Sequence, residues 1–303
     1  MKVLVLGGNG FIGSHVVDHL LAAGHNVRVF GRSPECYREP LAQVEYRFGH
    51  FDDTSQVAEA LQGVDAVCHL ISTTVPGTSN LDPVADVEGN LVNTLHLLDQ
   101  MRKKDIRRIL YLSSGGTVYG NPEFSPISES HPLNPISSYG VVKVAIEKYL
   151  NMYQQLYGFQ PIILRPSNPY GPRQGHAGVQ GLIGTALARM LAGEPLEIWG
   201  DGSIVRDYMH VSDLARLCVA ALESDICGVF NAGSGEGHLI NEVVNVIREV
   251  ADHELQVTYR EGRSFDVKEV VLDISRAAAQ FGWKPGVSLI DGIRDQLQWL
   301  KTL

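Results

Sequence analysis

Short apolar runs and amphipathic segments alternate along the first half of the chain. The apolar runs at residues 2–7, 26–31, 66–71, 107–114 and 160–166 have the length and composition of buried strands. Between them, apolar residues recur at helical spacing in segments 12–24, 53–62, 87–104 and 137–158. This order of strands and helices predicts a parallel sheet that is covered by helices on both faces.

The regularity weakens after Pro166. A stretch rich in glycine and proline, residues 167–181, precedes helical patterns at 182–194 and at 289–301. We therefore predict an α/β fold in two parts. Residues 1–166 form a doubly wound domain, and residues 167–303 form mainly a smaller, discontinuous second domain, with segments near 205–235 returning to the first.

Composition excludes several classes of protein. The formal net charge is −9 and no basic run stands out, which argues against a nucleic-acid partner. No run of about 20 apolar residues is present, so no membrane span is expected. The four cysteines, Cys36, Cys68, Cys218 and Cys227, show neither a CxxC motif nor metal-ligand spacing. They are typical of reduced thiols in a cytoplasmic protein without a metal site.

A glycine-rich loop follows the first predicted strand and opens the first predicted helix. The sequence GGNGFIG at residues 7–13 contains a literal G-x-G-x-x-G at Gly8, Gly10 and Gly13, and Gly7 adds a G-x-x-G-x-x-G spacing. Glycines permit a tight turn there and let the backbone approach a pyrophosphate at the helix N-terminus. We predict a Rossmann-type dinucleotide site that includes Gly7, Gly10, Phe11, Ile12 and Gly13.

The form of the dinucleotide is left open by the second predicted strand. NAD-binding folds usually place an acidic residue at its end, whereas this chain has Gly31, Arg32 and Ser33. Arg32 suits the 2′-phosphate of NADP, but a solvated surface arginine explains it equally well. Asp52 or Asp53 is expected near the adenine, and a helix cap accounts for one of them as well. The prediction is NAD, with NADP as the alternative.

Tyr139 and Lys143 lie four residues apart in a predicted helix and therefore share one face. A free phenol has a pKa near 10, so it is a poor base at neutral pH. A neighbouring ammonium group and a positively charged nicotinamide ring would favour the phenolate. Tyr139 is thus a candidate general acid and base for a sugar or alcohol hydroxyl.

With these motifs, the chain resembles the extended short-chain dehydrogenases/reductases, in their nucleotide-sugar epimerase/dehydratase group. The likeness runs nearly end to end through GGNGFIG, SSGGTVYG, YGVVK, LRPSNPYGP and FNAGSGEG. Within the group the chain most resembles the UDP-glucose (UDP-galactose) 4-epimerases, and the stretch VRDYMHVSDLA at residues 205–215 is the most specific element.

The resemblance implies roles for residues outside these motifs. It places Leu70 and Asn90 at the cofactor, and it makes residues 167–303 the nucleotide-sugar domain. Asn168 and Leu182 stand where the family contacts the diphosphate and the uracil region, and Arg206 and Arg263 stand where its arginines clamp the diphosphate. The alternative role of Arg206 is a structural ion pair with Asp207. The alternative for Arg263 is an exposed arginine on the surface without a role in binding.

One further position bears on the size of the sugar. The resemblance places Val270 at a position where epimerases that are restricted to plain hexoses carry a bulky tyrosine. The smaller valine implies room for an N-acetyl group.

The stretch SSGGTVYG, residues 113–120, decides which chemistry remains. The family's hydroxyl position is taken by Gly115, so Ser114 is favoured as the catalytic hydroxyl, with Thr117 as the alternative. Ser113 is read as a hydroxyl that satisfies local polar groups at the end of the strand. Family members that eliminate water carry Asp and Glu where this chain has Gly115 and Gly116. The resemblance therefore argues against a dehydratase.

These observations predict an NAD-dependent 4-epimerase that acts on a UDP-hexose or UDP-N-acetylhexosamine through a transient 4-keto sugar. The alternatives are an NADP-dependent ketone reductase for a nucleotide-linked or lipid-linked sugar, and a non-catalytic dinucleotide-binding protein. The helices at 87–104 and 137–158 resemble the pair that forms the dimer interface in this family, so a homodimer is expected.

Overall fold

The computed structural model describes residues 1–175, 181–262 and 267–303. The chain forms two compact units that both draw on separate parts of the sequence. The first contains Met1–Gly120, Pro132–Arg165 and Ala215–Phe230, and the second contains Asn121–His131, Pro166–Leu214 and Asn231–Leu303. Residues 215–230 thus return to the first unit from the second half of the chain.

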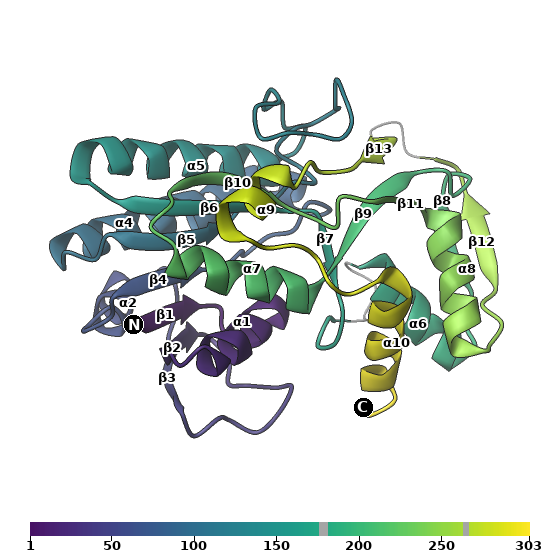
Figure 1. The fold of residues 1–303 in the computed structure, drawn as a ribbon, viewed down its shortest axis with the longest axis horizontal. Coiled ribbons are helices and arrows are strands. Elements are labelled where there is room, and N and C mark those ends of the chain that lie inside the picture. The colour runs from purple at the N-terminus through teal and green to yellow at the C-terminus, as the bar shows by residue number, and fades with distance from the viewer. Residues whose placement is uncertain (176–180, 263–266) are drawn as a thin grey trace. The chain divides into compact units, whose positions relative to one another are not determined.

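A seven-stranded sheet forms the centre of the first unit (Figure 1). Its strand order is β10-β6-β5-β4-β1-β2-β3, and the neighbouring pairs from β6 to β3 are parallel. The strands are β1 (Lys2–Leu6), β2 (Asn26–Gly31), β3 (Val44–Phe48), β4 (Ala66–His69), β5 (Arg108–Leu112), β6 (Gln160–Pro166) and β10 (Gly228–Ala232). The predicted doubly wound α/β fold is confirmed, and the strand order reverses direction between β1 and β4.

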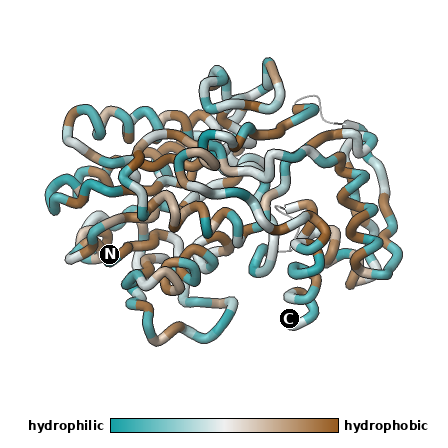
Figure 2. Tube along the Cα trace, in the orientation of Figure 1, coloured by the Kyte–Doolittle hydropathy of each residue, from teal (hydrophilic) through white to brown (hydrophobic). Residues whose placement is uncertain are grey.

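Helices cover both faces of this sheet. On one face lie α2 (Thr54–Ala60), α4 (Asn93–Lys103) and α5 (Ser138–Tyr157), and on the other lie α1 (Phe11–Ala22) and the C-terminal part of α7 (Val211–Glu223) (Figure 1). Strand side chains alternate between the faces, so Leu4 and Leu6 pack with Leu97, Leu98 and Ile146 of α4 and α5. Figure 2 shows hydrophobic residues concentrated along these strands.

The segment before α4 is less regular than predicted. The expected helix at 87–104 begins as a π-helical turn, η2 (Val87–Val92), and continues as α4. Two further short elements precede it, η1 (Ser79–Leu81) and α3 (Pro83–Asp86). Such π-helical turns occur frequently beside functional sites.

The second unit is built from short strands and four helices among its described residues. One sheet contains β7 (Asn168–Tyr170), β9 (Val205–His210), β11 (Gly237–Leu239) and β13 (Glu269–Val270), and β8 (Leu196–Trp199) pairs with β12 (Val257–Arg260). The helices are α6 (Leu182–Ala192), α8 (Ile240–Ala251), α9 (Ser275–Phe281) and α10 (Leu289–Leu300). The apolar faces of α6, α8 and α10 meet in a separate core around Leu187, Val243, Ile247 and Ile293.

Within the described ranges, none of the helices has the length and apolar character to cross a membrane. All four cysteines are free thiols, and Cys68 and Cys218 are buried.

Candidate active site

The glycine loop makes a tight turn between β1 and α1. Gly7 has φ +85°, a conformation that favours glycine, and its carbonyl accepts a hydrogen bond of 3.0 Å from the Gly10 amide. A Cβ on Gly13 would lie 2.1 Å from the Gly7 carbonyl oxygen, so only glycine fits there. Gly10 caps α1 without a side-chain hydrogen bond. The loop therefore presents bare backbone at the start of the helix, which suits a pyrophosphate.

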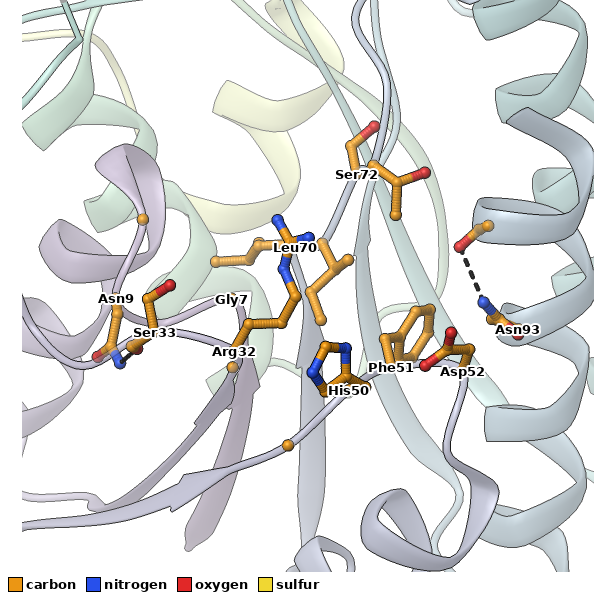
Figure 3. Close-up of a pocket in the computed structure, with 16 residues that line it drawn as sticks. Gly7, Asn9, Arg32, Ser33, His50, Phe51, Asp52, Leu70, Ser72 and Asn93 are labelled. Carbon is orange, nitrogen blue, oxygen red and sulfur yellow. Dashed lines mark hydrogen bonds between the residues drawn. The ribbon is translucent and has the colours of Figure 1, made fainter. Parts of the chain in front are cut away.

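A pocket of about 440 Å³ lies at the carboxyl ends of β1, β2, β3 and β4 (Figure 3). Among the residues predicted to contact the cofactor, Gly7, Gly10, Arg32, Asp52 and Leu70 line it. This edge, at the point where the strand order reverses, is where open α/β sheets bind their ligands. Its lining therefore fits a dinucleotide.

The other predicted cofactor residues do not line this pocket, and for two of them the structure shows other contacts. The Asp53 carboxylate accepts hydrogen bonds from the amides of Ser55 and Gln56, at 3.0 and 3.1 Å, as the N-cap of α2. The Asn90 side chain is buried and accepts a 2.8 Å hydrogen bond from the Thr73 amide. Asn90 thus holds the pocket residue Thr73 in place and is not itself part of the pocket wall. Phe11, Ile12 and Gly13 belong to the first turns of α1.

Tyr139 and Lys143 lie on α5, whose N-cap is Ser137. The Tyr139 phenol shares hydrogen bonds with the hydroxyls of Ser72 and Ser114, and Ser72 also lines the dinucleotide pocket. The Lys143 ammonium group donates a 2.9 Å hydrogen bond to the Leu112 carbonyl and lies 5.3 Å from the centre of the Tyr139 ring. The predicted pair is therefore assembled beside the pocket.

Burial dominates the protonation of this pair. Burial raises the pKa of Tyr139 to about 12; the hydrogen bonds with Ser72 and Ser114 lower it, and the charge of Asp86 raises it. Burial also lowers the pKa of Lys143 to about 8, against the charges of Glu147 and Asp86, which raise it. The expected influence of Lys143 on the phenol is thus outweighed, because removal from water disfavours the charged form of both groups.

Asp86 ties the pieces of this site together, although sequence reasoning did not single it out. Its carboxylate is fully buried and accepts hydrogen bonds from Thr74 Oγ1 (2.6 Å), Asn90 Nδ2 (2.9 Å) and Ser138 Oγ (2.6 Å). Thr74 belongs to the same loop as Ser72, and Ser138 precedes Tyr139. One carboxylate thereby fixes both segments that meet at the Tyr139 phenol.

A buried ion pair lies one helical turn beyond Lys143. Glu147 accepts hydrogen bonds from the Arg165 guanidinium at 3.0 and 2.6 Å, and the Ser113 hydroxyl donates to the same carboxylate. Arg165 also donates a 2.9 Å hydrogen bond to the Tyr119 hydroxyl. Ser113 therefore serves this network, while Tyr139, Lys143 and Glu147 form a polar stripe at i, i+4 and i+8 of α5.

The two candidate hydroxyls of the SSGGTVYG stretch differ in their surroundings. Ser114 is hydrogen-bonded to the Tyr139 phenol. The Thr117 hydroxyl oxygen is buried and has no hydrogen-bond partner within the described part of the chain. The geometry thus favours Ser114 over Thr117 as the group that acts together with Tyr139.

Ser114→Ala is expected to lower kcat by about 10²-fold or more, because it removes the hydroxyl that we expect to hold the reacting oxygen together with Tyr139. Thr117→Val, which keeps the shape and removes an unpaired hydroxyl, is expected to leave kcat nearly unchanged. Steady-state kinetics on both variants decides between them. A large loss in Thr117→Val with near-normal Ser114→Ala would give the role to Thr117.

Three residues that the resemblance assigns to the substrate share one face of the small sheet in the second unit. Val270 on β13 is the register partner of Arg206 on β9, and Asn168 on β7 is the partner of Tyr208, two residues further along β9. Register partners and alternate residues of a strand point to the same side. Asp207, between Arg206 and Tyr208, therefore points to the opposite side.

Because Asp207 and Arg206 point to opposite faces of the small sheet, their side chains are not placed to form an ion pair with each other. Its buried carboxylate accepts hydrogen bonds from Ser167 Oγ (3.1 Å) and from the amide and hydroxyl of Ser234 (both 2.7 Å). The Arg206 guanidinium donates a 2.9 Å hydrogen bond to the Val205 carbonyl. Asp207 thus holds the loop after β10.

Two predicted substrate residues remain, Leu182 and Arg263, and the structure describes only the first. Leu182 is the first residue of α6 and packs against the core of the second unit. Arg263 lies outside the described residues.

Comparison with known proteins agrees with this combination of a glycine loop, a Tyr-x-x-x-Lys pair and a second unit. Residues 3–233 match the model of the NAD dependent epimerase/dehydratase family. The chain belongs to this family. The UDP-glucose 4-epimerase of Thermotoga maritima, solved with UDP-glucose, is 33% identical with a TM-score of 0.94, and the match covers 100% of this chain and 99% of that one.

Two further family members are informative. The Thermus thermophilus UDP-glucose 4-epimerase, solved with NAD, is 35% identical over 99% of both chains, with a TM-score of 0.93. A dTDP-4-dehydro-6-deoxyglucose reductase from Escherichia coli is 30% identical, and the match covers 96% of this chain and 95% of that protein. The family therefore includes full-length relatives named for an epimerisation and for a reduction.

Sequence reasoning missed Ser72, Asp86 and Glu147. A signal exists for Glu147, which continues the i, i+4 spacing of Tyr139 and Lys143, and for Asp86, which stands four residues before Asn90 on one helical face. The hydroxyl run Ser72–Thr73–Thr74 directly after a predicted strand is the signal for Ser72.

Proposed function

We propose that the protein catalyses the 4-epimerisation of a UDP-hexose or UDP-N-acetylhexosamine with NAD as cofactor. The observation that carries the proposal is the placement of the half-buried Tyr139, whose phenol has its pKa lowered by the nearby hydroxyls of Ser114 and of Ser72, a residue that lines the dinucleotide pocket. In this scheme Tyr139 takes the proton of the C4 hydroxyl and later returns it, while Ser114 holds the same oxygen. Lys143 positions the phenol and balances its charge.

The cofactor would be held by the glycine loop together with Arg32, Asp52 and Leu70. When bound, NAD would supply an acceptor for the hydride that leaves C4 of the sugar, and in its reduced form it would be the source of the returning hydride. Between the two transfers the 4-keto sugar must present its other face, so the nucleotide has to stay fixed while the sugar turns. Asn168 and Arg206 on the shared face of the small sheet are the groups we assign to the diphosphate.

The same site lacks what an elimination of water would need. Gly115 and Gly116 carry no carboxylate, and the nearby carboxylate of Asp86 is buried and already accepts three hydrogen bonds. Oxidation at one carbon followed by reduction at the same carbon is the chemistry that the remaining groups support.

The experiment is to incubate the protein with UDP-galactose or UDP-GalNAc and to follow sugar and cofactor together. Formation of the 4-epimer with no net change in oxidised or reduced cofactor is the expected result. Consumption of one reduced cofactor for each sugar converted would support the second candidate instead.

That second candidate is a reductase of a 4-keto sugar carried by a nucleotide or a lipid. It is favoured by Arg32 and by the absence of an acidic residue at the end of β2, and a reductase stands among the full-length relatives. A reductase releases its oxidised cofactor in every cycle, so cofactor stoichiometry separates the two functions.

Val270→Tyr is expected to lower kcat/KM for UDP-GalNAc more than for UDP-galactose, because a larger side chain would fill the room we assign to the N-acetyl group. Val270 is buried, so the thermal stability of the variant must be compared with that of the parent protein. An equal loss on both substrates would contradict the assignment.

We also propose that the protein forms a homodimer through α5. This helix exposes apolar side chains at helical spacing, at Val141, Tyr149, Met152 and Leu156. A row of this kind on an outer helix face is typical of an association surface.

A further inference from the structure

We propose that the dinucleotide pocket accepts a 2′-phosphate on the adenosine ribose, so that the protein binds NADP at least as tightly as NAD. The inference rests on the proposed use of a nicotinamide dinucleotide, and it revises the form of that cofactor from the NAD of the proposed function. It departs from the NAD named for the family and for the Thermus thermophilus relative.

Residues 31–33, which begin the turn after β2, carry a positive charge and no negative one. Gly31, Arg32 and Ser33 all line the pocket, and Figure 3 shows the Arg32 side chain extending into it. NAD-binding folds use an acidic residue here to bind the ribose 2′-hydroxyl, whereas an arginine accommodates a 2′-phosphate. The guanidinium fork and the serine hydroxyl are donors that suit a phosphate.

The turn is also held in place. The Asn9 side chain, which comes from the glycine loop, donates a 2.7 Å hydrogen bond to the Ser33 carbonyl. This bond fastens the turn after β2 to the loop that would carry the pyrophosphate. The arginine and the serine therefore lie at a fixed place relative to the dinucleotide backbone.

The carboxylate in the pocket lining belongs to a different strand end. Among the described residues that line the pocket, Asp52 is the one acid, and it follows β3. Figure 3 shows His50 between Arg32 and Asp52. Gly31, Arg32 and Ser33 thus bring no like charge to the pocket, and the carboxylate of Glu35, further along the turn, lies outside the lining and pairs with Arg38.

Gly31 leaves space at the position where an acidic side chain would stand. A Cβ built on Gly31 meets no atom within 4 Å, and its φ lies outside the left-handed region. Neither crowding nor backbone conformation therefore requires glycine at position 31, and an aspartate can be introduced there. This makes Gly31→Asp a direct test.

The test is isothermal titration of the full chain, stripped of nucleotide, with NAD and with NADP. The parent protein is expected to bind NADP with a Kd no higher than that of NAD. Gly31→Asp is expected to weaken NADP binding by about tenfold or more, since it places a like charge at the phosphate, while NAD binding is kept or strengthened. Arg32→Ala is expected to weaken NADP binding and to change NAD binding little.

Arg47→Ala serves as the control for loss of one surface charge, because Arg47 lies outside this pocket and its side chain is largely exposed. It is expected to leave both affinities unchanged. A parent protein that binds NAD several-fold more tightly than NADP, or an Arg32→Ala variant that loses both ligands equally, would overturn the proposal. Since binding is measured without sugar, failure here leaves the 4-epimerase proposal to its own assay.

Discussion

Tyr139→Phe is expected to lower kcat by about 10²- to 10⁴-fold, because it removes the hydroxyl to which we assign proton exchange with the sugar. The aromatic ring stays, so its packing near the Lys143 ammonium group, 5.3 Å from the ring centre, should persist. Dinucleotide affinity is expected to be little changed. The measurement is steady-state kinetics combined with titration of the cofactor.

The chain offers a matched control for this variant. Tyr111 also lies beside Lys143, with its ring centre 4.8 Å from the ammonium nitrogen. Its buried hydroxyl has no hydrogen-bond partner within residues that the structure describes, so Tyr111→Phe should keep near-normal kcat. If the two variants lose activity equally, the effect would belong to packing around Lys143 rather than to proton transfer.

Arg165→Met is expected to lower the free energy of unfolding by about 3–5 kcal/mol, because it leaves the Glu147 carboxylate buried without its partner. The two side chains are 3% and 2% exposed, and two hydrogen bonds join them. Denaturant unfolding followed by circular dichroism measures the change.

A double variant distinguishes the loss of the whole Arg165–Glu147 ion pair from the loss of one partner. The double variant Arg165→Met/Glu147→Gln removes both charges and should recover a substantial share of the loss, since no unpaired charge remains. Arg102→Met, which removes one partner of an exposed ion pair, is the control and should change stability little. Additive losses in the double variant would contradict the role assigned to the buried pair.

Sequence patterns predicted the larger sheet well because its central strands are buried on both faces and read as continuous apolar runs. The edge strand β3 was missed although its sequence VEYRF alternates apolar and charged residues, the period of a half-buried strand, because it is not a continuous apolar run like the central strands. The small sheet was also missed. The strands β7, β11 and β13 have two or three residues each, too few to display a period.

The site was predictable only where its residues are neighbours in sequence. Tyr139 and Lys143 were found by their spacing, and the glycine loop by its position between a strand and a helix. Asp86 was not, because its contact with Ser138 joins residues 52 positions apart. The raised pKa of Tyr139 was likewise out of reach, because it depends on how deeply the phenol is buried.

The central claim is that hydride leaves C4 of the sugar and returns to the same carbon. The most direct measurement uses UDP-galactose labelled with deuterium at C4 and follows the product by nuclear magnetic resonance and mass spectrometry. The account predicts the 4-epimer with deuterium retained at C4 and no net change in the cofactor. Loss of the label to the dinucleotide pool, with stoichiometric turnover of cofactor, would contradict it.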